Sequence, residues 1–447
     1  MAGPFHKAFW RGGTRSRLVN IGHLLTGNAA NIVIGLPAII LTARALGPAS
    51  YGVLALILTY AQVIKRIADF QVWQPLIRFG ASLDVMDDRE KLMALLKYGV
   101  LFDLCSSVGS WLFAMLGILA AIELFDLPRE TVAMIAIYAT VLLFNINGSP
   151  TAILRMANKY RTIAYVQLIA GVLKLLLCGA AYLAGAGVLT FVCIWALTDS
   201  LAPLLVTAAA GMALRRQRLH RFYRADLKGL FTRFPGLWRF TWSANFSGTL
   251  WSSAQMMDTL LVGWLTDPAS AGLYYFAKRI ARLGQQAAAQ VQAVVYPDIT
   301  RLWAAARYDA FRRLVMQTEL IVAGFGLLLF AASVVLGARI IAWTAGPEFG
   351  GAAPLLIVQS FALMLTMSGT VMRSALLAMG RAGAVLLIVA VATLAFQVTA
   401  IGLLPVMGPM GANVAHVVLG VIWLMGLGIA FRRALSTVSE PEAATTV

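Results

Sequence analysis

The stretch LVNIGHLLTGNAANIVIGLPAIILTA, residues 18–43, contains no aspartate, glutamate, lysine or arginine. A helix needs about 20 mostly apolar residues to cross a hydrocarbon core roughly 30 Å thick, and this stretch is longer. A signal peptide has a shorter apolar core that ends at a small-residue cleavage site. The stretch therefore predicts a retained membrane-spanning helix.

The rest of the chain has the same character. Apolar residues make up 60% of the 447 residues and charged residues only 12%, whereas soluble domains carry nearer a quarter of charged residues. Apolar runs separated by charged or Gly- and Pro-rich gaps predict an all-α polytopic membrane protein with about twelve transmembrane helices. We expect spans at residues 20–43, 50–77, 98–122, 131–154, 162–184, 188–214, 240–266, 270–297, 317–343, 352–372, 382–404 and 411–431.

Lysines and arginines are concentrated in alternate connections between these spans. Of the 36 basic residues, 27 fall on one side, in both tails and alternate connections, and only Arg44, Arg129 and Arg339 fall on the other. Positive residues resist translocation, so both termini are predicted to be cytoplasmic. The net charge of +17 then reflects topology and affinity for anionic membrane lipids. No recognised nucleic-acid-binding module accompanies it, so we expect no nucleic-acid partner.

The basic stretch RRQRLHRFYRADLKGLFTRF, residues 215–234, alternates charge with Leu and Phe, which predicts a helix lying on the membrane surface. It falls in a cytoplasmic linker, 215–239, between bundles at 1–214 and 240–431, and a cytoplasmic tail follows at 432–447. Three isolated cysteines in apolar runs predict neither a disulfide framework nor a metal site. No Walker-type phosphate loop appears, and we expect no cofactor.

Two turns of the chain share a motif. LTARALGPASYGVL, residues 41–54, and LVGWLTDPASAGLY, residues 261–274, carry Pro-Ala-Ser-x-Gly in register, 220 residues apart, each at the first hairpin of a six-span half. This predicts a duplication. Six spans per half is an even number, so the two six-helix bundles are expected to be related by pseudo-twofold symmetry along the membrane normal. Transporters built from such repeats bind substrate between the halves.

Polar side chains follow one face of the second and the eighth span. On the eighth span they recur every four residues, at Lys278, Arg282, Gln286 and Gln290. On the second span they recur at steps of three and four, at Thr59, Gln62, Arg66 and Asp69, with Lys65 beside them. A charge at the bilayer centre costs at least about 2.5 kcal/mol. Both faces should therefore look into protein or a water-filled cavity.

Asp258 and Lys278 lie ten residues before and after Pro268, so a helical hairpin would place them at the same depth. Two readings stay open: a structural ion pair between the seventh and eighth spans, and a counter-ion or proton-sensitive switch that releases Lys278 or Arg282 for substrate. For Lys174 we expect a structural pair with Asp103 or Asp199, which also lie within predicted spans.

Five cationic side chains lie on the second and eighth spans: Lys65, Arg66, Lys278, Arg279 and Arg282. Lys and Arg bind phosphate oxygens through charge-assisted hydrogen bonds, which are strongest where water is scarce. The pattern therefore favours a fixed anion such as a diphosphate. Arg279 points about 100° away from Lys278 on a helix, so it is expected to face a neighbouring helix.

The segments TARALGPASYGVL and MDTLLVGWLTDPASAGLYYFAKRI resemble the polysaccharide-biosynthesis flippases of the multidrug/oligosaccharidyl-lipid/polysaccharide (MOP) exporter superfamily, in particular the Wzx type. The resemblance implies two six-helix bundles in the bacterial inner membrane that move an undecaprenyl-diphosphate-linked oligosaccharide from the cytoplasmic to the outer leaflet. It places Arg66, Lys278, Arg279 and Arg282 at the diphosphate. Polysaccharide polymerases and other assembly proteins are the implied partners. Lipid II flippases are similar but usually have two more helices.

Two alternatives remain. A cation-coupled multidrug exporter of the same superfamily would be expected to have an acidic or neutral cavity. A membrane enzyme of polysaccharide assembly needs a large outer loop with catalytic residues, and the longest outer connections here, near 123–130 and 344–351, are about eight residues long. Asp69, Asp258 and Glu319 are candidates for ion coupling or for a counter-ion role, and His416 is expected to be a satisfied helix-packing residue.

Overall fold

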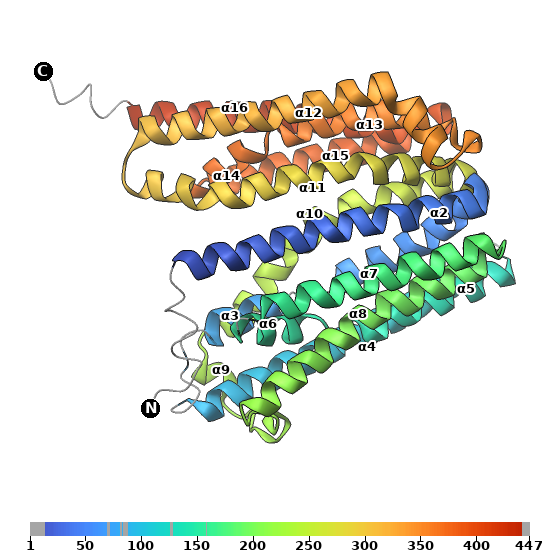
Figure 1. The fold of residues 1–447 in the computed structure, drawn as a ribbon. Helices are drawn as coiled ribbons and strands as arrows, with labels where there is room; N and C mark the ends of the chain where they lie inside the picture. Colours follow the sequence, from blue (N-terminus) through green and yellow to red (C-terminus); the bar gives the residue numbers. More distant parts are fainter. Residues whose placement is uncertain are drawn as a thin grey trace, which may run out of the picture. The chain divides into compact units, whose positions relative to one another are not determined.

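A computed structural model describes the backbone at residues 14–68, 72–80, 83, 88–125, 128–157 and 159–439. Side chains in these ranges are described except at 14–33, 68, 124–125, 243–255, 287–291, 293–294, 297 and 437–439. Every regular element in the described ranges is helical (Figure 1). The chain forms two compact units, one of residues 1–45 and 57–256 and the other of residues 46–56 and 257–447. Each unit is described by itself.

Unit 1 is a helical bundle with buried apolar clusters between its helices. It contains most of α2 (Thr14–Ala68), α3 (Trp73–Gly80), α4 (Arg89–Phe125), α5 (Arg129–Ala139), η1 (Thr140–Phe144), α6 (Gly148–Met156), α7 (Tyr160–Leu183) and α8 (Val188–Arg216). A fully buried cluster that includes Leu76, Leu95 and Leu154 joins α3, α4 and α6. Burial of these side chains against one another fixes α3 and α6, which frame the candidate site.

Unit 2 contains most of the second half of the chain. Its helices are α11 (Pro268–Ala304), α12 (Tyr308–Thr344), α13 (Ala352–Met367), α14 (Thr370–Ala378), α15 (Ala382–Met407) and α16 (Pro409–Ser439), with the last part of α10 (Leu237–Leu265). Helix α13 packs against α11, α12 and α16, so it lies at the centre of this bundle. The bundle limits of 1–214 and 240–431 come from the repeat in the sequence, whereas the two units come from contacts in the structure. The two divisions therefore measure different things, and the bundle limits stay a prediction.

Nine helical segments of the described chain are long and apolar enough to cross a membrane. Eight of them correspond to single predicted spans, and the ninth, within α2, covers the first two spans together. The two other predicted spans coincide with α10 and α11, and α11 carries the polar stripe that lowers its apolar content. The fold class expected from the sequence, an all-α polytopic membrane protein, is confirmed.

The two Pro-Ala-Ser-x-Gly turns are packed against each other within unit 2. A Cβ added at Gly52 would overlap the carbonyl oxygen of Pro268, and a Cβ added at Gly272 would overlap that of Pro48. Each glycine therefore lets one backbone approach the other, which only a residue without a side chain permits. This reciprocal contact gives the repeated motif a physical reason.

The residue before each motif turns the chain in a different way. Gly47 bends α2 with φ +67°, a conformation that favours glycine. Asp267 instead caps α11, since its carboxylate accepts hydrogen bonds from Ser270 N at 2.9 Å and Ser270 Oγ at 2.6 Å. These hydrogen bonds lower the pKa of the Asp267 carboxyl.

The fourth predicted span of each half is interrupted. Instead of one helix over 131–154, α5 passes into a 3₁₀ turn and α6 starts anew at Gly148, two residues before Pro150. Instead of one helix over 352–372, α13 ends at Met367 and α14 starts at Thr370 after Gly369. In both halves a glycine lies at the restart, so the expectation of continuous helices was wrong at matching positions.

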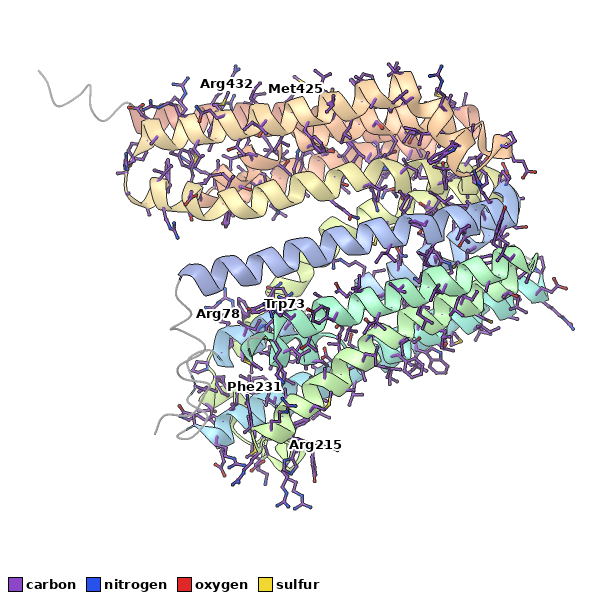
Figure 2. All side chains as sticks on the ribbon, viewed as in Figure 1. Trp73, Arg78, Arg215, Phe231, Met425 and Arg432 are labelled. Atoms are coloured by element: carbon purple, nitrogen blue, oxygen red, sulfur yellow. The ribbon has the colours of Figure 1, made fainter. Side chains whose placement is uncertain are left out.

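The basic stretch 215–234 also differs from expectation, because it does not form one helix on the membrane surface. Only two short pieces are helical, η2 (Phe222–Arg224) and α9 (Leu230–Arg233), and Arg218 and Gly229 have positive φ. Apolar side chains of the stretch pack into the core of unit 1, at Leu219, Leu230 and Phe234. Arg215, by contrast, points away from the bundle (Figure 2). Burial of the apolar residues therefore outweighs the amphipathic pattern.

Candidate functional site

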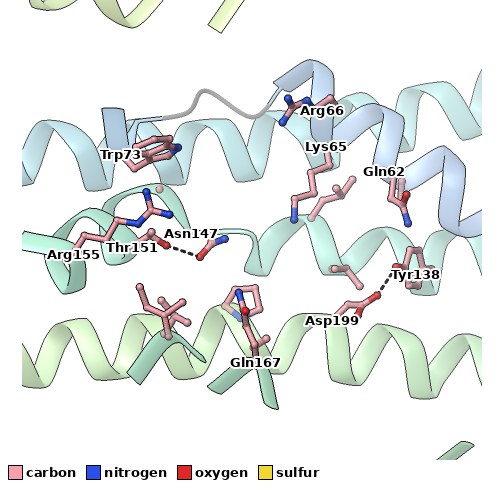
Figure 3. A pocket seen from close by; sticks show the side chains of 18 residues that line it. Gln62, Lys65, Arg66, Trp73, Tyr138, Asn147, Thr151, Arg155, Gln167 and Asp199 are labelled. Carbon is pink, nitrogen blue, oxygen red and sulfur yellow. Dashed lines mark hydrogen bonds between the residues drawn. The ribbon is translucent and has the colours of Figure 1, made fainter. Parts of the chain in front are cut away.

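Unit 1 encloses a cavity of about 650 Å³ whose walls come from α2, α3 and α5 to α8 (Figure 3). Three cations line it, Lys65 and Arg66 from α2 and Arg155 from α6. Its other polar lining residues are Gln62, Tyr138, Asn147, Thr151, Gln167 and Asp199, and Trp73 is an aromatic one. The cavity thus combines positive charge, amides and an aromatic ring within one bundle.

The spacing on α2 explains how three of these side chains reach the cavity. Gln62, Lys65 and Arg66 are three and four residues apart, so they share one face of a helix. Figure 3 shows Lys65 pointing across the cavity toward the wall that carries Gln167 and Asp199. The structure therefore brings together Gln62 and Arg66 of the predicted stripe and Lys65 beside it, whereas Asp69 lies outside the described residues.

Arg155 and Trp73 form the far end of the cavity. The Arg155 guanidinium lies 4.6 Å from the centroid of the Trp73 ring, in cation–π contact. Arg155 directly follows the predicted span 131–154 and is one of the 27 basic residues counted on the cytoplasmic side, so the sequence did not indicate it as a cavity residue. Its role in the cavity depends on the restart of the chain as α6, which turns Asn147, Thr151 and Arg155 toward the same space.

Asp199, the acid in the cavity lining, has two close partners. Lys174 Nζ lies 2.6 Å from Asp199 Oδ1, and Tyr138 Oη donates to Oδ2 at 2.8 Å. The Lys174 amino group also lies 4.0 Å from the centroid of Trp195. The expected structural pair of Lys174 is confirmed, with Asp199 as the acid, and the carboxylate is neutralised by a lysine behind the cavity wall.

A second cluster of charged groups is buried in unit 2, around Asp258 of α10. Lys278 Nζ contacts both of its carboxylate oxygens, and Oδ2 also meets Tyr274 Oη at 2.7 Å and His416 Nε2 at 2.8 Å. Asp258 is fully buried and Lys278 is 5% exposed. The expected contact between Asp258 and Lys278 is confirmed, and in this structure Lys278 is held by the acid.

His416 is a member of this cluster that sequence reasoning did not connect with it. It is satisfied, as expected, but its partner Asp258 lies 158 residues earlier on another helix. No local pattern in the sequence selects Asp258 as its partner. A histidine in the middle of a span indicates a contact with an acid only once the packing of α16 against the other helices is known.

The other predicted residues of α11 lie at different depths. Arg282 and Arg279 are half-buried and Gln286 is exposed, while the Gln290 side chain lies outside the described residues. Arg282 interacts electrostatically with Asp258 and Lys278, and Arg279 interacts with Tyr51 instead. The polar stripe of Lys278 and Arg282 therefore continues from the Asp258 cluster along α11. Arg279 lies on a different face of the helix, as its position next to Lys278 requires.

Comparisons with known proteins agree with this architecture. Residues 18–303 match the family model described as polysaccharide biosynthesis protein. The inner membrane protein YghQ of Escherichia coli strain K12 is 25% identical over 345 residues, which cover 76% of this chain and 96% of YghQ.

Two solved structures share the fold at low identity. A multidrug resistance MATE family transporter of the MOP superfamily, in an inward-facing conformation, is 14% identical, with a TM-score of 0.72 over 93% of this chain and 96% of its own. The lipid II flippase MurJ is 15% identical, with a TM-score of 0.72 over 93% of this chain and 90% of its own. With the family model matched over more than half of its length, this chain belongs to the polysaccharide biosynthesis protein family.

Proposed function

We propose that this protein is a flippase that moves an undecaprenyl-diphosphate-linked oligosaccharide from the cytoplasmic to the outer leaflet of the bacterial inner membrane by alternating access. The observation that carries the proposal is the cavity of unit 1, where Lys65, Arg66 and Arg155 face one space. Both phosphates of a diphosphate accept charge-assisted hydrogen bonds from such groups. Membership of the polysaccharide biosynthesis family supports a glycan as cargo.

The uncharged lining suits the remainder of such a substrate. Gln62, Asn147 and Gln167 offer amide donors and acceptors for sugar hydroxyls, and Trp73 offers an apolar face for a sugar ring. A cation-coupled multidrug exporter is the alternative within the same fold. The cavity disfavours it, because three cations face one acid and that acid is already paired with Lys174.

Residues of unit 2 enter the proposal in a second role. We assign Lys278, Arg282 and Arg279 to the anionic headgroup as well, with Asp258 as the counter-ion of Lys278. Since Lys278 is engaged with Asp258, it becomes available for a phosphate only when that pair opens. Ion coupling through Asp69, Asp258 or Glu319 belongs to the same proposal, and a transport rate indifferent to imposed ion gradients would contradict it. Both termini are proposed to be cytoplasmic.

The test is binding of undecaprenyl diphosphate to the purified protein in nanodiscs, followed by translocation in proteoliposomes. Arg66→Ala should weaken binding by roughly 10- to 150-fold, since a hydrogen bond to a charged group contributes about 1.5–3 kcal/mol. Arg215→Ala, which removes an exposed arginine of the same unit, is the matched control and should bind normally.

Equal binding by both variants would refute the assignment of the cavity to the diphosphate.

A gene deletion distinguishes the alternatives in the cell. Accumulation of a lipid-linked intermediate on the cytoplasmic face supports the flippase. Sensitivity to cationic drugs without such accumulation supports the exporter. A truncated glycan polymer with normal translocation would favour the membrane enzyme.

A further inference from the structure

The interrupted fourth span of unit 1 is held by an acid of the preceding span. Asp103 lies in the middle of α4, is 5% exposed, and its Oδ2 accepts a hydrogen bond from Ser149 N at 2.6 Å. Ser149 is the second residue of α6, so the acid meets the new helix at its N-terminus. A carboxylate at this end satisfies a backbone N–H and interacts favourably with the helix dipole.

Unit 2 repeats the arrangement. Glu319 of α12 is 6% exposed, and its Oε2 accepts a hydrogen bond from Met372 N at 3.3 Å, in the first turn of α14. The two acids are 216 residues apart and the two amides 223, close to the 220 residues between the turn motifs. The same device thus occurs at the same place in each half.

Space for the first contact is provided by Gly148. A Cβ at this position would stand 2.7 Å from Asp103 Oδ1, closer than real Cβ atoms approach an oxygen. A larger residue would therefore push the carboxylate away from Ser149. Burying a charge among apolar spans costs free energy, so we interpret the contact as specific. The glycine leaves room for the carboxylate, and the carboxylate holds the N-terminus of α6.

What Asp103 holds is one wall of the cavity. Helix α6 and the residue before it contribute Asn147, Thr151 and Arg155 to the lining, and Thr151 Oγ1 donates to Asn147 Oδ1 at 3.1 Å. Arg155 lies six residues after Ser149, about 9 Å along the helix. A rotation or shift of α6 at its N-terminus would thus move the Arg155 guanidinium relative to the cations of α2.

We propose that Asp103 is a positioning residue of the cavity, whose carboxylate fastens α6 and so fixes Arg155 opposite Lys65 and Arg66. Glu319 is its counterpart in unit 2, where it fastens α14. Helix α14 in turn braces α11, because Gln292 Nε2 donates to Ser374 Oγ at 2.7 Å. The effect of Asp103 on substrate rests on the proposed function, whereas its effect on α6 does not.

The placement of α6 is tested by hydrogen–deuterium exchange of the full-length protein in nanodiscs. Asp103→Leu removes the acceptor, and Gly148→Ala displaces it from the other side. Both should speed exchange in residues 148–156 by ten-fold or more and leave residues 160–183 of α7 unchanged. Asp103→Asn keeps an acceptor oxygen and should fall between these variants and the wild type. Unchanged exchange in both Asp103→Leu and Gly148→Ala would overturn the proposal.

The link to substrate is tested by a double-mutant cycle on undecaprenyl diphosphate binding. Arg155→Ala and Asp103→Leu should each weaken binding by about ten-fold, and the two together should weaken it no further, because Arg155 is already displaced. A general loss of folding would give additive effects instead, and additive effects would overturn this step. Should Asp103→Leu not fold, Gly148→Ala takes its place. Absence of binding by the wild type would refute the proposed function and leave the exchange result standing.

Discussion

Replacing Asp258 should destabilise unit 2 more than any other single change to its charged groups. Asp258 is fully buried and accepts contacts from Lys278, Tyr274 Oη, His416 Nε2 and the backbone N–H of Thr259. Asp258→Asn keeps the shape but removes the negative charge opposite Lys278. Breaking a buried ion pair by removing one partner costs about 3–5 kcal/mol.

Replacing the other partner of the pair, Lys278, should lower the stability of unit 2 by less. In Lys278→Met the carboxylate retains its hydrogen bonds from Tyr274, His416 and Thr259, so the charge that stays behind is still solvated by protein groups. The double variant Asp258→Asn/Lys278→Met removes both charges at once. Because replacement of a whole buried pair is often close to neutral, the double variant should recover most of the stability lost in Asp258→Asn.

The assay is the apparent melting temperature of the purified protein in detergent. With about 2–4 °C per kcal/mol for a unit of this size, Asp258→Asn should melt roughly 6–20 °C lower than the wild type. Asp298→Asn is the control, since its pair with Arg301 is exposed, with 60% and 79% of the side chains accessible. Such pairs contribute about 0–1 kcal/mol.

The result that would refute this reasoning is an Asp258→Asn variant that melts with the Asp298→Asn control. The double variant also separates the two readings of the pair. Restored stability with normal translocation identifies the pair as purely structural. Restored stability without translocation identifies Asp258 and Lys278 as part of the transport cycle.

Two further predictions concern the turn motif and the charge of the cavity. Gly52→Ala forces a Cβ onto the Pro268 backbone and should cost about 1–3 kcal/mol, whereas Gly35→Ala, in open space on the same helix, should gain about 0.5–1 kcal/mol; melting temperatures that move together would contradict the close backbone contact. Lys174→Met should expose the charge of Asp199 to the cavity and weaken undecaprenyl diphosphate binding roughly five-fold, the equivalent of about 1 kcal/mol. Asp199→Asn in the same chain should restore binding, and no rescue would show that the lysine acts only in packing.

The features that could be predicted from the sequence depend on local periodicity. Spans follow from apolar runs, and the facing of Gln62, Lys65 and Arg66 follows from their helical spacing. The contact between Asp258 and Lys278 also follows, because a hairpin around Pro268 sets equal depths on two adjacent helices. In each case one turn or one helix contains all the information needed.

The features that could not be predicted depend on packing between distant segments. Arg155 reaches the cavity only because the chain restarts at Gly148, and hydropathy alone does not register that break. The prediction of a surface helix at 215–234 was wrong because the apolar residues of this stretch are buried in the core of unit 1 instead of at the membrane surface. His416 meets Asp258 across 158 residues, a pairing that only the arrangement of α10, α11 and α16 determines.

The two halves agree in their backbone devices and differ in their charges. The paired glycine turns, the interrupted fourth span and the acid of the third span recur in both, which is what a shared scaffold for movement requires. The placement of the cations does not recur: unit 1 directs Lys65, Arg66 and Arg155 into a cavity, while unit 2 pairs Lys278 with a buried acid. Under the proposed function, this duplicated geometry with unequal charge leads us to expect that unit 1 contributes the standing affinity for an anion. In unit 2, by contrast, we expect a phosphate to reach Lys278 only after its pair with Asp258 opens.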